Sequence, residues 1–313
     1  MTKIYTIGEL LIDFIPNKSN CGLKDVDSFS KMAGGAPANV AVSASKLGSE
    51  AYYVGMVGKD GFGDFLIDTV KSYGVKSNYI YQTDQANTSL AFVSLMEDGQ
   101  REFSFYRNPG ADMLLEEKHV EAIDLTKDDI ISFCSVDLIE APVKYATKRF
   151  LEKANEVGAT VLFDPNLRFN LWDDLDELKA TVLDFMKYAQ IIKISDDELE
   201  FITGHSDEKK AIEFIKTTTD AKIIITRGSK GAYAEFGDLK VESSIPKVEA
   251  IDTTGAGDAF VGGILNFIDK RKKSIDKYSS ADVQDMLDFA NKVAAHSVTK
   301  YGAMASYPRV ENL

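Results

Sequence analysis

The chain has 313 residues, of which 44% are hydrophobic and 27% charged, as is usual for a globular protein. This length is enough for one large α/β domain or two small ones. The net charge of −13 argues against nucleic acid or an anionic membrane as the main partner, because both bind basic surfaces. An anionic cofactor would therefore need local cations.

Short apolar runs alternate along the chain with longer amphipathic runs. The short runs predict strands at 3–8, 51–57, 130–135, 159–164, 190–195 and 222–227. The longer runs predict helices at 37–47, 62–73, 143–157, 175–188, 209–217, 258–270 and 281–300. This alternation indicates an α/β fold with a central, mostly parallel sheet and helices on both faces.

Two strand-like segments, 89–96 and 101–107, interrupt the alternation. The turn at 97–100, Glu-Asp-Gly-Gln, joins them and predicts a β-hairpin. Segments 10–15 and 26–32 could supply partner strands. Such a hairpin would lie outside the main sheet, as a flap or lid. The alternative is an edge hairpin that does not move.

The cysteines and the N-terminal residues narrow the class of protein. Cys21 and Cys134 are far apart and no C-x-x-C occurs, so we expect no disulfide framework and no structural zinc site. Cys134 lies in an apolar run and is expected in the core. Glu9 and Asp13 interrupt the first apolar stretch, and no run is long enough to cross a membrane. We expect a cytoplasmic protein.

The most informative motif covers residues 252–260, Asp-Thr-Thr-Gly-Ala-Gly-Asp-Ala-Phe. The small residues 255–257 run into Asp258, and an apolar helical stretch follows. Glycines let the backbone approach a ligand, and the free N–H groups at a helix start attract anions. Asp258 is placed to take a proton from a hydroxyl, and the helix dipole should lower its pKa. The alternative is an ordinary helix start with an acidic first turn.

Four further segments place glycines, acids or cations where strands end or helices begin. They are the glycine turn and helix start at 34–41, the strand end at 164–168, the acidic helix start at 195–198 and the strand end at 226–231. In open α/β sheets, ligands bind at the carboxyl ends of the strands. The acids at 195–198 could hold a magnesium ion through water.

Several common motifs are absent from the chain. No P-loop motif occurs, and Phe260 stands where the dinucleotide fingerprint needs its third glycine. The chain also has no H-E-x-x-H and no G-x-S-x-G. A hydride-transfer enzyme is therefore disfavoured, and any phosphate-binding apparatus is of another type.

In this order, the motifs resemble those of the ribokinase-like family of sugar kinases, the PfkB carbohydrate kinases. The resemblance covers essentially the whole chain and is greatest to the fructokinases. The segments that carry the fructokinase resemblance are 8–14, 105–109, 164–168 and 194–199. The resemblance implies a ribokinase-like fold with one domain over 1–313. It also implies a small β-lid from about 10–33 and 88–109.

The resemblance implies a role for each matching residue. Asp258 would be the catalytic base. The N–H groups of Ala256, Gly257 and Asp258, after Gly255, would form the anion hole, and Arg168 would lie near the sugar or the transferring phosphate. The expected sugar contacts are Asp13, Gly34, Gly35, Asn39, Arg107, Arg168 and Asp258. The expected nucleotide contacts are Lys193, Ser195, Thr226, Gly228, Gly231, Gly255, Gly257 and Asn291.

The resemblance also implies ATP and Mg²⁺ as cofactors and a site for K⁺. Glu198 would hold Mg²⁺ through water; the family motif is commonly Asn-x-x-Glu, whereas this chain, like many fructokinases, has Ser195. Many relatives bind potassium beside the anion hole. The matching residues here are Asp252, Thr254, Gly302 and Ser306.

The function that the resemblance implies is ATP-dependent phosphorylation of fructose at its 6-hydroxyl. The partners would be a small sugar and ATP, and the β-lid offers a surface for a homodimer. The near alternative is 2-keto-3-deoxygluconate kinase. Ribokinase and nucleoside kinase fit the flanking segments less well. A non-catalytic sugar- or nucleotide-sensing protein is a further alternative, and the intact motif at 255–258 argues against it.

Overall fold

A large twisted sheet forms the centre of the molecule. The computed structural model describes residues 2–17, 22–95 and 101–313, and in these the larger sheet has the strand order β13-β12-β11-β10-β9-β8-β1-β4-β5. Its strands are β1 (Ile4–Ile7), β4 (Ala51–Gly58), β5 (Lys76–Thr83), β8 (Ile130–Phe133), β9 (Thr160–Phe163), β10 (Ile191–Ser195), β11 (Lys222–Thr226), β12 (Ala232–Phe236) and β13 (Leu239–Ser243). Neighbouring strands are parallel except around β12, which pairs antiparallel with β11 and β13. The predicted α/β fold is confirmed.

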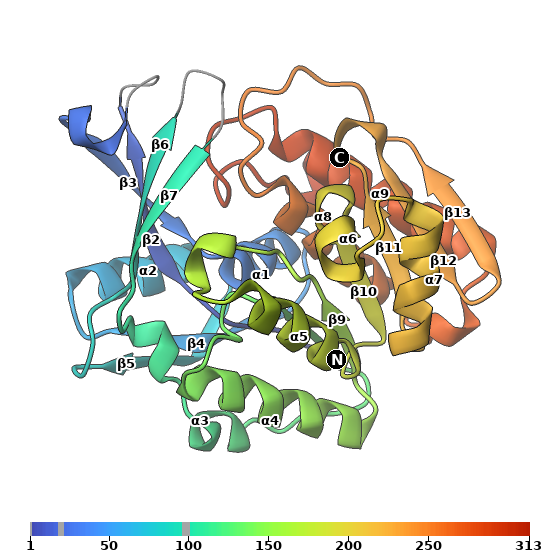
Figure 1. The fold of residues 1–313 in the computed structure, drawn as a ribbon, viewed down its shortest axis with the longest axis horizontal. Coiled ribbons are helices and arrows are strands. Elements are labelled where there is room, and N and C mark those ends of the chain that lie inside the picture. The colour runs from blue at the N-terminus through green and yellow to red at the C-terminus, as the bar shows by residue number, and fades with distance from the viewer. Residues whose placement is uncertain (1, 18–21, 96–100) are drawn as a thin grey trace.

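Helices cover both faces of this sheet (Figure 1). They are α1 (Ala36–Lys46), α2 (Gly61–Ser72), α3 (Glu117–Glu121), α4 (Pro142–Val157), α5 (Leu175–Met186), α6 (Asp196–Thr203), α7 (Glu208–Thr218), α8 (Ala256–Arg271) and α9 (Ser280–Ser297). Strand β11 shows why its run is apolar throughout. Ile223 and Ile225 pack on the face of α4 to α7, whereas Ile224 packs on the face of α8 and α9.

A smaller sheet stands to one side of the larger one (Figure 1). Its order is β3-β2-β6-β7, with β2 (Leu11–Pro16), β3 (Phe29–Gly34), β6 (Leu90–Leu95) and β7 (Arg101–Tyr106). Strands β6 and β7 pair antiparallel, as predicted, although the turn at 97–100 lies outside the described residues. Cys21 also lies outside them, whereas Cys134 is buried as expected.

Some elements differ from the prediction. Strand β3 begins at Phe29 rather than at residue 26, because Phe29 pairs with Pro16 and its ring packs against Phe14. Strands β5, β12 and β13 and helix α3 were not predicted, and helix α6 was predicted only by its acidic start at 195–198. Strand β5 is an edge strand with many exposed polar residues, so it lacks an apolar run. The last long helix ends at Ser297, three residues early.

Helices α1 and α8 approach each other closely at the centre of the molecule. A Cβ atom placed on Gly262 of α8 would lie 2.4 Å from the Cβ atom of Ser43 on α1. The Ser43 hydroxyl donates a hydrogen bond to the Ala259 carbonyl (3.3 Å). On the other side of α8, Gly263 lies against Ala290 of α9 in the same way. Gly262 therefore lets α1 approach α8, and Gly263 lets α9 approach α8 from the other side. None of the helices in the described ranges has the length and apolar character that a membrane span requires.

We predict that Gly262→Ala destabilises the protein because its methyl group pushes α1 and α8 apart. Overpacking of this kind costs about 1–3 kcal/mol, more than the gain of at most about 1 kcal/mol in helix propensity. Gly61→Ala is the matched control, since Gly61 opens α2 and faces open space. Urea unfolding should show a loss for Gly262→Ala and no loss for Gly61→Ala; equal changes would contradict the close packing.

Candidate active site

The N-termini of α1 and α8 face each other where the parallel strands end. Asn39, in the first turn of α1, donates a hydrogen bond from Nδ2 to Oδ2 of Asp258 in the first turn of α8 (2.9 Å). Both side chains are buried, with 6% of Asn39 and 9% of Asp258 exposed. The carboxylate is therefore held at one position by a group 219 residues away in sequence.

The surroundings of Asp258 raise its pKa. Burial is the largest cause, and the hydrogen bond from Asn39 and the charges of Arg168 and Lys193 lower the pKa by less. The expectation that the helix dipole would lower this pKa was wrong in direction, because removing the carboxylate from water outweighs the favourable contacts. A raised pKa makes the carboxylate a better proton acceptor once it is ionised.

The turn before α8 is shaped for a close backbone approach. Gly255 has a left-handed conformation (φ 72°), and a Cβ atom there would lie 2.3 Å from the hydroxyl of Tyr307. That hydroxyl donates a hydrogen bond to the Gly255 carbonyl (3.2 Å). The N–H of Ala256 donates to Thr253 (3.2 Å). The predicted anion hole would thus depend on the N–H groups of Gly257 and Asp258, which lack partners within the helix.

A cavity of about 750 Å³ opens beside the start of α8. It contains these residues predicted to contact the nucleotide: Lys193, Ser195, Thr226, Gly228, Gly231, Gly257 and Asn291. The apolar part of its wall was not predicted; it is made by Ile245, Pro246, Val248, Ala250, Phe260, Ala294 and Val298. The available signal in the sequence was the apolar residues Ile245, Pro246 and Val248 in a segment with neither a strand nor a helix pattern, shortly before the motif at 252–260. The cavity therefore joins an anion-binding end to an apolar end.

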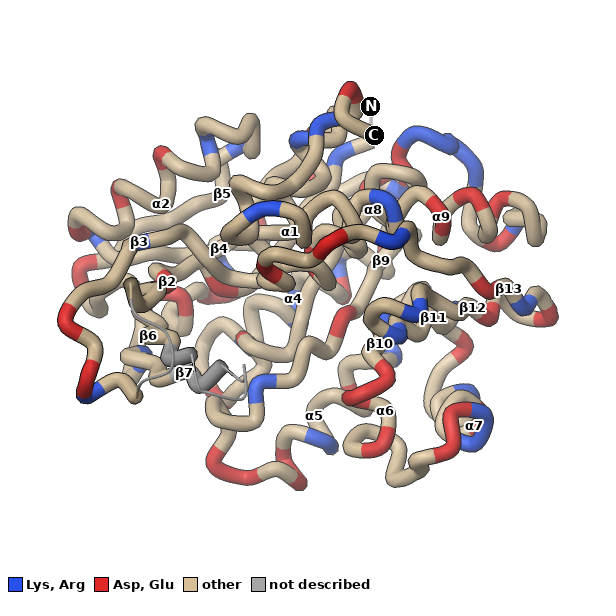
Figure 2. The backbone as a smooth tube through the Cα atoms, turned by 90° about the horizontal axis from the view of Figure 1, so that it is seen from above, with Lys and Arg blue, Asp and Glu red and all other residues tan. Residues whose placement is uncertain are grey.

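Lys193 supplies the local cation that an anionic ligand needs in this acidic protein. Acidic and basic residues are otherwise interspersed over the molecule (Figure 2). The Lys193 Nζ atom lies 3.1 Å from each carboxylate oxygen of Asp164 and 3.6 Å from where a Cβ of Gly257 would be. Burial lowers the pKa of Lys193, but the charges of Asp164, Glu198 and Asp258 more than compensate, and the net pKa is raised. Burial raises the pKa of Asp164 to about 6.

Glu198 connects Ser195, which lines this cavity, to Leu167, which follows the end of β9. Its Oε2 atom accepts hydrogen bonds from the N–H (3.0 Å) and hydroxyl (2.9 Å) of Ser195, and its Oε1 atom accepts from the N–H of Leu167 (2.7 Å). The described residues contain no group of three or more His, Cys, Asp or Glu side chains that could hold a metal ion. A divalent ion would therefore be bound mainly by water molecules and by the phosphates of a bound nucleotide, rather than by a set of protein side chains.

The residues predicted to bind potassium gather behind the glycine turn. The Asp252 carboxylate accepts hydrogen bonds from the N–H (2.9 Å) and hydroxyl (2.6 Å) of Thr254 and from the N–H of Gly302 (2.9 Å). Ser306 is fully buried, and its hydroxyl donates a hydrogen bond to the carbonyl of Ala303. The Ala303 side chain lies against Gly255, where a Cβ atom would be 2.7 Å away. Carboxylate, hydroxyl and carbonyl oxygens are the ligands that hard cations prefer.

On the other side of Asp258 lies the junction between the smaller sheet and α1. Asp13 of β2 lies against Gly34, where a Cβ atom would be 1.9 Å from Oδ2 of Asp13. Gly35 follows with a positive φ of 105°. Arg168 is half-buried and donates to its neighbour's carbonyl, while its charge acts on Asp258. Most of the residues predicted to bind sugar are therefore on this side of the carboxylate.

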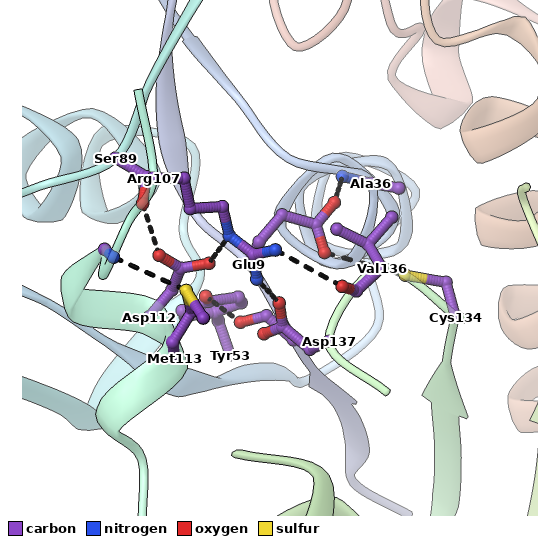
Figure 3. Close-up of polar contacts among 12 residues, drawn as sticks. Glu9, Ala36, Tyr53, Ser89, Arg107, Asp112, Met113, Cys134, Val136 and Asp137 are labelled. Atoms are coloured by element: carbon purple, nitrogen blue, oxygen red, sulfur yellow. Dashed lines mark hydrogen bonds and ion pairs between the residues drawn. The ribbon is translucent and has the colours of Figure 1, made fainter. Parts of the chain in front are cut away.

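Arg107 is more deeply enclosed than the sequence indicated (Figure 3). Its Nε atom donates to Asp112 (2.6 Å), one terminal nitrogen donates to Asp137, and the other donates to the Val136 carbonyl (3.4 Å). Only 2% of its side chain is exposed. A second cavity, of about 390 Å³, lies beside it and is also lined by Trp172. Contact between Arg107 and a sugar stays a prediction.

Comparison with known proteins agrees with this geometry. The pfkB family carbohydrate kinase model matches residues 1–310. Fructokinase-1 of Oryza sativa subsp. japonica is 38% identical over 306 residues, which cover 97% of this chain and 94% of the relative.

Two solved structures are also similar. A double mutant of the fructokinase of Vibrio cholerae, with fructose, ADP and potassium bound, has a TM-score of 0.90 at 32% identity, over 100% of this chain and 97% of that one. The aminoimidazole riboside kinase of Salmonella enterica, with aminoimidazole riboside and an ATP analogue bound, has a TM-score of 0.86 at 29% identity, over 99% and 98% of the chains. This chain belongs to the pfkB family of carbohydrate kinases.

Proposed function

We propose that this protein is a fructokinase, which transfers the γ-phosphoryl group of ATP to the 6-hydroxyl of D-fructose. The observation that carries the proposal is the buried Asp258 carboxylate, held by Asn39 between the cavity with Lys193 and the residues around Asp13. The similarity to fructokinases supports fructose over 2-keto-3-deoxygluconate. A cytoplasmic location stays a prediction from the sequence.

In this mechanism, Asp258 accepts the proton of the sugar hydroxyl as that oxygen attacks the phosphorus. Asn39 orients the carboxylate through its 2.9 Å hydrogen bond, so the accepting oxygen points consistently toward the substrate. Phosphoryl transfer has a loose transition state, and positioning and charge stabilisation therefore contribute most of the rate. The N–H groups of Gly257 and Asp258 and the cation of Lys193 would stabilise the charge on the transferring group.

Mg²⁺ and K⁺ have distinct places in the proposal. Mg²⁺ would neutralise the ATP phosphates, with the acids at the start of α6 reaching it through water. Asp252, Thr254, Gly302 and Ser306 would hold K⁺ behind the glycine turn. A bound K⁺ would fix Asp252, which accepts hydrogen bonds from Thr254 and Gly302. In this way it would help to keep Gly255 in its left-handed conformation.

A coupled assay of ADP release tests the substrate. Fructose should give the highest kcat/KM in a panel with ribose, 2-keto-3-deoxygluconate, aminoimidazole riboside and adenosine. The riboside is included because of the similarity to the Salmonella enterica enzyme. A keto acid as the best substrate would overturn the assignment. Nucleotide and sugar binding without turnover of any acceptor would instead support the sensing alternative.

Asp258→Asn should reduce kcat about 10²–10⁴-fold, because the amide cannot accept the proton. Binding of ADP, measured by calorimetry, should change little. In the wild type, kcat should rise with pH through an acid limb set by Asp258, and burial places that limb above the ordinary carboxylate pKa. Asn39→Leu removes a contact that lowers this pKa, and should therefore move the limb to higher pH. A fully active Asp258→Asn variant would exclude Asp258 as the base.

We further propose that the smaller sheet mediates a homodimer. Among the described residues, its edge strands β3 and β7 each pair with one strand only, β2 and β6, and have no second partner on their outer sides. Tyr106, at the end of β7, is 67% exposed and packs edge-on against Phe92. Sedimentation equilibrium should show a dimer that Tyr106→Asp weakens. The control is Tyr145→Asp on α4, where the exposed ring lies on the larger body. A monomeric wild type at micromolar concentration would overturn this proposal.

A further inference from the structure

A buried group of charged side chains lies between the smaller sheet and the start of α1 (Figure 3). Its members are Glu9, Asp112, Asp137 and Arg107, of which Glu9 is 3% exposed and both aspartates are 1% exposed. Arg107 forms ion pairs with Asp112 and Asp137. In the sequence, Glu9 interrupts an apolar stretch and lies in segment 8–14, which resembles the fructokinases, but no pattern there indicates a role for Glu9 or for the two aspartates. We call these four residues the Glu9 cluster.

Glu9 is the member of the Glu9 cluster that contacts α1. Its Oε1 atom accepts a hydrogen bond from the N–H of Ala36, the first residue of α1 (2.7 Å). Its Oε2 atom accepts a weaker contact from the thiol of Cys134 (3.6 Å). The backbone is equally close, since a Cβ atom on Gly35 would lie 2.4 Å from the Glu9 carbonyl oxygen. The end of β1 therefore holds the first turn of α1 through both backbone and side chain.

We infer that Glu9 is a positioning residue for phosphoryl transfer: its carboxyl group fixes the start of α1, and through α1 the Asn39–Asp258 contact. The inference rests on the proposed function. Asn39 lies three residues after Ala36 in the same first turn, and its N–H donates to the carbonyl of Gly35 (2.9 Å). A rotation or shift of this first turn would move Asn39 relative to Asp258. Glu9 itself touches neither Asn39 nor Asp258 by any hydrogen bond in the described part of the chain.

The Glu9 cluster also connects this helix start to the smaller sheet. Arg107 follows directly after β7, and Asp112 accepts a hydrogen bond from the hydroxyl of Ser89, directly before β6 (2.5 Å). Both strands of the hairpin are thus anchored next to Glu9. The placement of Asn39 is thereby linked to the strands that border the sugar side of the site.

Charge explains why Glu9 can keep its hydrogen bond without a cation of its own. The groups that face it are Arg107, Asp112, Asp137, Cys134 and Tyr53. Three carboxyl groups share one guanidinium away from water, and burial raises the pKa of Glu9 to about 7, with the Arg107 charge opposing the shift. A neutral carboxyl group still presents an oxygen that accepts from Ala36.

Two substitutions at Glu9 distinguish the effect of the hydrogen-bond acceptor for the Ala36 N–H from the effect of the carboxylate charge. Glu9→Gln keeps an oxygen for the Ala36 N–H, and should keep kcat within about threefold of the wild type. Glu9→Met removes the acceptor. It should reduce kcat about 10–100-fold, as expected when reacting groups are misplaced by about 1 Å. The KM for ATP and the affinity for ADP should change less than about twofold, because the nucleotide cavity does not include Glu9.

Asp129→Leu is the matched control. Asp129 is another buried carboxylate that accepts hydrogen bonds from backbone N–H groups, those of Lys3 (3.0 Å) and Thr126 (2.8 Å). It directly precedes β8, the parallel neighbour of β1, and therefore lies at the opposite ends of these strands from Glu9, which follows β1. This variant should lose stability but keep both kinetic constants. The inference is overturned if Asp129→Leu lowers kcat as much as Glu9→Met, or if Glu9→Met leaves kcat unchanged. If Glu9→Met does not fold, Ala36→Pro removes the same hydrogen bond from the donor side and should give the same loss.

A second readout does not depend on the substrate. The pKa of Glu9 is raised from 4.5 in the unfolded chain to about 7 in the folded protein. The folded state therefore binds this proton more tightly, and stability falls as pH rises from about 4.5 to 7. The side chain of Glu9→Gln does not titrate in this range. The urea midpoint of the variant, relative to that of the wild type, should therefore rise as the pH increases from about 4.5 to 7. A constant difference would contradict a buried, protonated Glu9.

The kinetic tests use the sugar that the panel identifies as the substrate. A wild type that does not phosphorylate fructose refutes the proposed substrate alone. The Glu9 inference fails only through the Glu9→Met kinetics, the Asp129→Leu control or the pH dependence of unfolding.

Discussion

The hydrogen bond between Asn39 and Asp258 is the contact on which the candidate site depends. It joins two helix starts that are 219 residues apart, and the close packing of α1 on α8 at Gly262 brings these starts together. A carboxylate with 9% exposure loses most of its hydration, and one oriented donor replaces part of what is lost. The hydration that is not replaced leaves the pKa of Asp258 raised, and a raised pKa suits a group that must accept a proton.

Around this contact, the molecule separates its charges by function. The protein as a whole is acidic, yet Lys193 and Arg168 are held near Asp258, Lys193 by a buried carboxylate and Arg168 by a carbonyl. The acids of the Glu9 cluster lie away from the cavity and balance Arg107. A polyanionic ligand therefore meets cations and N–H groups at the start of α8.

Sequence patterns predicted the elements whose burial is uniform. Runs such as 222–227 are apolar on both faces because helices cover both faces, so the pattern is unambiguous. Strand β5 was missed because an edge strand alternates weakly. Strands β12 and β13 were missed together, although they form a hairpin through the two-residue turn Gly237-Asp238. That turn is itself a hairpin signal of the kind recognised at 97–100.

The sequence by itself determined the fold class, the family resemblance and the glycine turn before Asp258, because these depend on residue type and local spacing. Only the tertiary structure decided which groups surround each charge. It enclosed Arg107 between two aspartates, occupied Glu198 with backbone contacts, and reversed the expected pKa shift of Asp258. The physical reason is that desolvation and charge pairing depend on side chains brought together from distant segments, which no local pattern records.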